Sequence, residues 1–166
     1  MARTSPRDYR LGVGGLFRMD DSQERLDHDR EADQQKEDRA TQKRQILEGR
    51  SPGLWTEVRL GLQQKAKDLN DNGGKELLVA PATKLERLTI FAKFGDGQRE
   101  TTVEFESESF AIYYYSKRAS DRIPDISENL RMAVTDDNSV DLVTSHGRPQ
   151  SADDVVDRIL NSLMVW

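Results

Sequence analysis

The two histidines are the first residues to consider for catalysis or metal binding, because the sequence contains no cysteine. His28 stands between Asp27 and Asp29, but consecutive helical residues point about 100° apart, so this triplet is not a ready set of metal ligands. His146 follows Ser145, and a Ser–His pair needs a base that reaches the hydroxyl and a third group that orients it. Adjacent residues rarely provide that geometry. We therefore predict a solvated His28 and a loop His146, and keep a hydrolase that uses His146 with carboxylates as an alternative.

Three other patterns resemble ligand or catalytic sites, but each has a weakness. The segment 136–141 is acidic like a calcium loop, yet it lacks the sixth-position glycine and the distant glutamate of an EF-hand. The segment 12–15 is rich in glycine, but it has neither the dinucleotide-binding spacing nor the Lys-Ser/Thr pair of a P-loop. Glu104, Glu106 and Glu108 alternate near a strand end, where acidic residues commonly protect a sheet edge. We predict no metal, no cofactor and no catalytic residue, and favour a non-enzymatic protein.

Composition limits the classes of partner. Charged residues make up 33% of the 166 residues and the formal net charge is −5, so the chain as a whole lacks the basic surface that nucleic acid usually needs. The absence of cysteine excludes disulfides, thiolate chemistry and cysteine-based metal sites. No run of about eighteen apolar residues is present, so we expect no membrane-spanning helix. A cysteine-free chain suits a reducing compartment, and we predict a cytoplasmic protein.

The chain changes character at Ser51, and this change predicts three segments. Residues 1–19 form a basic, glycine-containing tail with four arginines and one acidic residue. Residues 20–50 form a charged arm, either helical or disordered, with almost no apolar content. Residues 51–166 form the globular domain, which is large enough for one hydrophobic core.

The charged arm has only part of a coiled-coil pattern. Four apolar residues share one seven-residue register, but Asp33 occupies a fifth position of that register. The positions three residues later are all polar, whereas a dimeric coiled coil needs both rows apolar. The end of the arm is basic, and Arg39, Lys43 and Arg44 are our candidates for contact with a charged partner. A solvated helix face is the alternative.

Two helices are predicted in the globular domain. Gly49 ends the arm, and Ser51-Pro52 starts a fresh helix with serine as N-cap and proline in the first turn. Ser151 and Asp154 resemble a capping box at the start of the closing helix. Both helices have an apolar face at helical spacing. These faces comprise Trp55, Val58, Leu62, Ala66 and Leu69 in the first helix, and Val155, Val156, Ile159, Leu160 and Leu163 in the second.

Alternating residues between these helices predict a meander of strands, whose turns fix the register. Asp96-Gly97 is a two-residue hairpin signal, residues 106–109 and 136–138 make two further turns, and residues 77–80 form a short first strand. The apolar pairs that follow are Leu88 with Phe105, Ile90 with Val103, Phe105 with Phe110, Val103 with Ile112, Val134 with Val140, and Met132 with Leu142. The predicted fold is therefore a two-layer α+β domain, an antiparallel meander of five to six strands with an N-terminal and a C-terminal helix on one face.

The other face of the predicted sheet mixes aromatic and polar residues. The registers give one row of Phe91, Thr102 and Tyr113 and a second row of Lys93, Glu100 and Tyr115. Exposed aromatic residues can receive a protein partner or stack on bases, but Glu100 and Glu104 would repel phosphates. The arm or tail could also cover this face.

We therefore predict a protein-interaction or regulatory module. It would bind a protein partner through Phe91, Lys93, Tyr113 and Tyr115 of the sheet together with the basic end of the arm. A sheet that binds single-stranded nucleic acid is a disfavoured alternative, and a homo-oligomer stays open.

Overall fold

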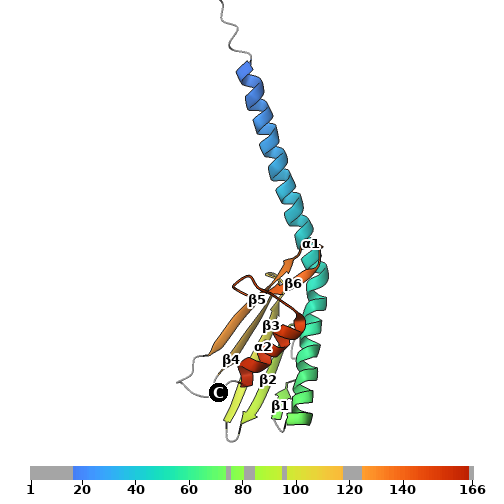
Figure 1. The fold of residues 1–166 in the computed structure, drawn as a ribbon, viewed down its shortest axis with the longest axis vertical. Coiled ribbons are helices and arrows are strands. Elements are labelled where there is room, and N and C mark those ends of the chain that lie inside the picture. Colours follow the sequence, from blue (N-terminus) through green and yellow to red (C-terminus); the bar gives the residue numbers. More distant parts are fainter. Residues whose placement is uncertain (1–16, 74–75, 81–84, 95–96, 118–124, 165–166) are drawn as a thin grey trace, which may run out of the picture. The chain divides into compact units, whose positions relative to one another are not determined.

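The computed structural model describes residues 17–73, 76–80, 85–94, 97–117 and 125–164. Residues 1–16 of the predicted basic tail lie outside them. The elements in chain order are α1 (Phe17–Gly73), β1 (Glu76–Val79), β2 (Arg87–Phe94), β3 (Gly97–Glu106), β4 (Ala111–Lys117), β5 (Ile126–Val134), β6 (Val140–Val143), β7 (Pro149–Gln150) and α2 (Ala152–Met164) (Figure 1). The described strands form one sheet in which each strand pairs antiparallel with the next along the chain.

The predicted α+β class with an antiparallel meander is confirmed, but the predicted number of strands is wrong. The described sheet has seven strands rather than five or six. The additional strand is β7, whose two residues pair with Leu142 and Val143 of β6. Two residues are too few to show an alternating pattern, which explains why the sequence did not reveal this strand.

The helix boundary that we predicted at Ser51 is also wrong, because α1 continues through Pro52. Proline inside a helix removes one backbone hydrogen bond and costs about 3 kcal/mol. Packing on both sides of Pro52 opposes this cost. Leu47, before the proline, and Leu54, after it, both pack against the hydrophobic core. Ser51, directly before the proline, is also buried. The apolar face of α1 thus begins one turn before the proline, and tertiary contacts override the local signal.

The chain divides into two compact units, Met1–Gln42 and Lys43–Trp166. In the first unit, described side chains from Arg25 to Gln42 are exposed, except for the half-buried Ala32. Polar contacts along this part of α1 are local, such as the 3.0 Å ion pair between Lys36 Nζ and Asp33 Oδ1. Exposed pairs at this spacing stabilise a helix by only a few tenths of a kcal/mol. This part of α1 is therefore a solvated helix.

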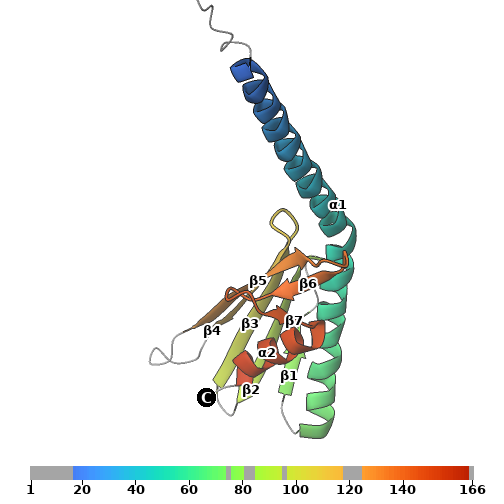
Figure 2. The same cartoon turned by 45° about the horizontal axis from the view of Figure 1, so that its top comes forward.

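In the second unit, the later part of α1 and α2 lie over the same face of the sheet (Figures 1 and 2). The predicted apolar faces of both helices are buried there, apart from the half-buried Leu69. The Trp55 ring stacks on Phe105 with ring centroids 6.1 Å apart, and Trp55 Nε1 donates a 2.8 Å hydrogen bond to the carbonyl of Leu85. The capping box also forms, because the Asp154 backbone N–H donates to Ser151 Oγ and the Ser151 N–H donates to Asp154 Oδ2, each at 3.1 Å.

The strand registers differ from our prediction in the first two hairpins. Leu88 pairs with Val103 and Ile90 with Thr101, a shift of two residues. Phe105 likewise pairs with Ile112 rather than Phe110. The first shift follows from the strand bounds, because β2 runs to Phe94 and β3 begins at Gly97, whereas we predicted Gly97 in the turn; Gly95 and Asp96 lie outside the described residues. The predicted pairings of β5 with β6 are confirmed.

A shift of two residues keeps every side chain on its predicted face, because side chains alternate with a period of two. The predicted core is therefore the observed core. Leu88, Ile90, Val103, Ile112 and Leu130 are fully buried on the face that the helices cover. The consequence of the shift is confined to which residues are cross-strand neighbours on each face.

Candidate functional site

The exposed face of β2 to β5 carries the candidate site. Within the described part of the second unit, α2 and α1 both pack on the opposite face (Figure 2). Tyr113 and Tyr115 of β4 are 38% and 45% exposed, although both side chains are large and partly apolar. Solvated tyrosines two residues apart on one strand share a face and present two aromatic surfaces to a partner.

The corrected register changes the neighbours of these tyrosines. Tyr113 lies between Glu104 of β3 and Asn129 of β5, and Tyr115 lies in the next row. Thr102 and Ser127 flank Tyr115. The predicted row of Phe91, Thr102 and Tyr113 does not exist, and neither does the row of Lys93, Glu100 and Tyr115.

Phe91 is therefore separated from the tyrosines. It pairs with Leu78 of β1 on one side and with Glu100 of β3 on the other. Its side chain is half-buried, and that of Leu78 is 53% exposed. The outer face thus has two aromatic regions: Phe91 with Leu78, and Tyr113 with Tyr115.

A hollow of about 370 Å³ opens at the two tyrosines. We call it the tyrosine hollow. It is lined by Thr102, Glu104, Tyr113, Tyr114, Tyr115, Ser127, Glu128 and Asn129. Its volume lies at the low end of the roughly 300–1,000 Å³ range of ligand pockets. A side chain of a partner fits this size better than a large cofactor does.

A second hollow, also of about 370 Å³, shares Glu104 and Tyr113 with the first. We call it the acidic hollow. Its lining includes four carboxylates and one guanidinium, from Glu86, Glu104, Glu106, Glu108 and Arg87. Arg87 already forms an ion pair with Glu104. The surplus of carboxylates makes the surface beside Tyr113 negative, which favours a cationic partner and disfavours phosphate.

The Tyr115 ring is held in place by a hydrogen bond that its hydroxyl donates to Asp125. This hydrogen bond raises the pKa of Tyr115 above its ordinary value, and partial desolvation has a smaller effect in the same direction. The hydroxyl therefore stays protonated at neutral pH and anchors one wall of the tyrosine hollow. A fixed aromatic wall loses less conformational entropy on binding than a mobile one.

Asn129 contributes a feature that sequence analysis missed. Its Oδ1 atom is buried and accepts no hydrogen bond within the described part of the chain. A buried acceptor without a donor costs about 1–3 kcal/mol. We expected the strand to start at Leu130, which placed Asn129 in a loop. The residue belongs instead to β5, directly opposite Tyr113.

The predicted basic residues of the second unit, Lys93, Lys43 and Arg44, do not line the tyrosine hollow. Lys93 lies near the far end of β2 and forms a 3.3 Å ion pair with Glu76. Arg44 forms a 2.9 Å ion pair with Glu48, one turn further along α1. Lys43 is exposed in the second unit, and Arg39 is exposed in the first. The exposure of Arg39, Lys43 and Arg44 suits a solvated helix face and contact with a charged partner equally, so their role in partner contact stays a prediction.

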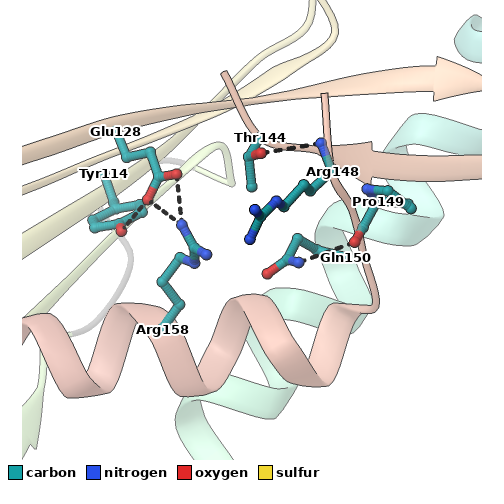
Figure 3. Close-up of polar contacts among 7 residues, drawn as sticks. All are labelled: Tyr114, Glu128, Thr144, Arg148, Pro149, Gln150 and Arg158. Atoms are coloured by element: carbon teal, nitrogen blue, oxygen red, sulfur yellow. Dashed lines mark hydrogen bonds and ion pairs between the residues drawn. The ribbon is translucent and has the colours of Figure 1, made fainter. Parts of the chain in front are cut away.

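His146 lines neither hollow, and His28 belongs to the first unit. His28 is exposed in α1, and His146 is exposed in the turn between β6 and β7. That turn is closed by a 3.2 Å hydrogen bond from the Arg148 backbone N–H to Thr144 Oγ1 (Figure 3). An open-turn His146 argues against the hydrolase alternative. Among the described residues, no group of three or more acidic or histidine side chains is placed to hold a metal ion.

A second polar cluster links β4, β5 and α2 on the face of the sheet that α2 covers. The Tyr114 hydroxyl donates to Glu128 Oε2 at 2.6 Å, and Arg158 Nη1 donates to Glu128 Oε1 at 2.7 Å and to Oε2 at 3.0 Å (Figure 3). Burial, reinforced by the hydrogen bond to Glu128, raises the pKa of Tyr114 far above its ordinary value. The hydrogen bond to Glu128 likewise raises the pKa of Arg158. Because both carboxylate oxygens are occupied, we read this cluster as a structural tie for α2.

No protein-family model, curated protein or solved structure matches the chain. No helix in the described ranges has the length and apolar content needed to cross a membrane. The local geometry of the outer sheet face is thus the basis for any functional assignment.

Proposed function

We propose that this protein is an interaction module that binds a protein partner through the outer face of its sheet at Tyr113 and Tyr115. The observation that supports this proposal most directly is the tyrosine hollow itself. Two exposed aromatic side chains line a depression on the sheet face opposite to the one on which α2 and the second-unit part of α1 pack. Tyrosines in such positions are typical centres of protein interfaces, because each ring offers apolar area together with a polar hydroxyl.

The corrected register narrows the proposed surface. The proposed surface keeps Tyr113 and Tyr115 of β4. It omits Phe91 and Lys93, because these two residues of β2 lie next to β1 and are separated from the tyrosines by β3. Glu104 takes the place predicted for Thr102 on one side of Tyr113, and Asn129 lies on the other side. A base-stacking surface is less well supported, because carboxylates outnumber cations in the lining of the hollows at the tyrosines.

Comparison of matched variants tests the proposal. The wild-type chain, a Tyr113→Ala/Tyr115→Ala double variant and a Phe91→Ala variant are used to capture proteins from an extract of the source cells. Any protein captured by wild type is then purified, and its dissociation constant is measured for each variant. We expect at least a tenfold loss of affinity in the double variant and little change in Phe91→Ala, since a central aromatic residue commonly contributes about 1–2 kcal/mol or more.

Thermal unfolding of all three proteins provides the control for folding. A cooperative transition in the double variant would show that lost binding is not lost structure. If every purified partner binds the double variant as tightly as wild type, the tyrosine surface is not the binding surface.

A further inference from the structure

We propose that the tyrosine hollow receives the guanidinium group of an arginine, presented by a basic segment of the protein partner. This inference rests on the proposed function and specifies the chemistry of the partner. Three separate features of the outer face lead to it: the two tyrosine rings, the unpaired acceptor of Asn129, and the carboxylates of the adjacent acidic hollow.

The tyrosine rings favour a cation that is planar and partly apolar. A guanidinium stacks on an aromatic face, and the attraction amounts to about 0.5–1 kcal/mol at an exposed ring. Tyr113 and Tyr115 line the same hollow, so one guanidinium can contact both rings. Arginine suits this arrangement better than lysine, because its group is flat and weakly hydrated.

Asn129 lines the hollow and carries a hydrogen-bond acceptor. Its Oδ1 is buried and accepts no hydrogen bond from the described residues, while its strand position pairs with Tyr113. A guanidinium carries five N–H donors and no acceptor. A small rotation of the amide toward an incoming guanidinium would replace an unsatisfied group with a hydrogen bond, so part of the existing cost would be recovered on binding.

The acidic hollow favours further positive charge in the partner next to the inserted arginine. Glu86, Glu106 and Glu108 lie beside Tyr113, on the side of the hollow that faces away from Tyr115. Arg87 neutralises Glu104 but leaves these three carboxylates in excess. A segment with further basic residues next to the inserted arginine would meet this negative surface, whereas an acidic or phosphorylated segment would be repelled.

Short peptides test the proposal on the full chain. The probe is an acetylated, amidated Gly-Arg-Arg-Arg-Gly peptide, and its matched controls replace each arginine by citrulline or by lysine. Citrulline keeps the shape of arginine and removes its charge. Binding is measured by calorimetry, and NMR shift changes of backbone amides locate the peptide.

We expect the arginine peptide to shift the amides of Tyr113, Tyr115 and Asn129, and to bind at least tenfold more tightly than the citrulline peptide. The lysine peptide should bind about three- to fivefold more weakly than the arginine peptide, because it stacks less well. Each of Tyr113→Ala and Tyr115→Ala should weaken arginine binding about fivefold. Phe91→Ala, the matched aromatic control on the same face, should leave it unchanged.

Variants of Asn129 and the carboxylates separate the contributions. Asn129→Leu should weaken arginine binding about fivefold by removing the acceptor. Glu106→Gln/Glu108→Gln should weaken binding of the three-arginine peptide but have less effect on a peptide with one arginine. Equal binding of the citrulline peptide, or arginine binding that survives loss of both tyrosines, would overturn the proposal. So would a concentration-dependent dimer that the tyrosine substitutions abolish, because a second copy would then occupy the hollow.

Failure here is distinguishable from failure of the proposed function. A purified partner that requires Tyr113 and Tyr115 while arginine peptides do not bind would retain the interaction surface and reject its arginine specificity. A partner that ignores the tyrosines would reject both.

Discussion

Gly61 of α1 and Val156 of α2 approach each other so closely that only a hydrogen fits between them. A Cβ atom added to Gly61 would lie 2.9 Å from Val156 Cγ2, which is closer than unbonded carbon atoms normally come. Val156 is fully buried, and its branched side chain has few alternative rotamers. The glycine therefore sets how closely the two helices pack over the sheet, which none of the apolar patterns indicated.

Gly61→Ala should destabilise the protein, although alanine is the better helix former by about 1 kcal/mol. We expect a net loss of up to about 2 kcal/mol in the free energy of unfolding, since overpacking a rigid contact costs about 1–3 kcal/mol. Urea unfolding measures the change. In a Val156→Ala background the same substitution should become neutral or stabilising, because the colliding methyl is gone. Equal effects in both backgrounds would contradict the contact.

Pro52→Ala should raise the free energy of unfolding by about 1–2 kcal/mol. The continuous helix α1 lacks the hydrogen bond that residue 52 would donate to the carbonyl of Glu48, and alanine restores it. Ser51→Ala should change the free energy of unfolding little, because Ser51 lies inside the continuous helix and is not its N-cap. Loss of a serine that did cap a helix would cost about 1 kcal/mol. Gly53→Ala is the control, because its Cβ would meet open space and should add about 1 kcal/mol. Destabilisation by both Pro52→Ala and Ser51→Ala would instead indicate a fresh helix start at Ser51.

The sequence allowed the core to be predicted but left the hairpin registers ambiguous. Alternation determined that Leu88, Ile90 and Val103 face the helices, and all three are fully buried. It could not distinguish a register from another two residues away, because both keep these residues inside. The choice depended on the turn, and Gly95-Asp96 and Asp96-Gly97 are both good hairpin pairs. Where the turn left less choice, as between Val134 and Val140, the predicted pair is the observed one.

The candidate site was predictable only in part for the same reason. Tyr113 and Tyr115 were expected on the outer face, and they are exposed there. Their neighbours depend on the register, so the shift placed Glu104 where Thr102 was predicted beside Tyr113, and Asn129 joined because β5 begins earlier than predicted. The unpaired acceptor of Asn129 had no sequence signal, because whether a polar side chain finds a partner depends on three-dimensional contacts.

Removing either member of the Glu128–Arg158 pair should loosen α2 from the sheet. We expect Arg158→Met to reduce the free energy of unfolding by about 1–2 kcal/mol, because the largely buried Glu128 carboxylate loses a charged hydrogen-bond donor. Arg148→Met is the matched control, since this exposed arginine lies in the β6–β7 turn, and it should change stability by less than about 0.5 kcal/mol (Figure 3). Urea unfolding measures both, and equal effects would show that Glu128 does not depend on Arg158.

The same cluster predicts a loss of stability at alkaline pH that depends on Tyr114. Burial and the hydrogen bond to Glu128 raise the pKa of Tyr114 in the folded protein, whereas an unfolded tyrosine ionises near pH 10. Above pH 10 the unfolded chain therefore releases this proton and the folded chain retains it. The stabilisation is fully present below about pH 10 and declines as pH rises, by at most about 1.4 kcal/mol per pH unit for one group.

Tyr114→Phe should be less stable than wild type at pH 8, because it lacks the 2.6 Å hydrogen bond to Glu128. The difference between the two proteins should then shrink between about pH 10 and pH 11.5, because only wild type loses the contribution of this proton. Urea unfolding at several pH values measures the difference. Absorbance titration of the native proteins gives an independent check, since wild type should contain one tyrosine that resists ionisation and that the variant lacks. A stability difference that stays constant up to pH 11.5 would mean that Tyr114 ionises as readily in the folded protein as in the unfolded chain.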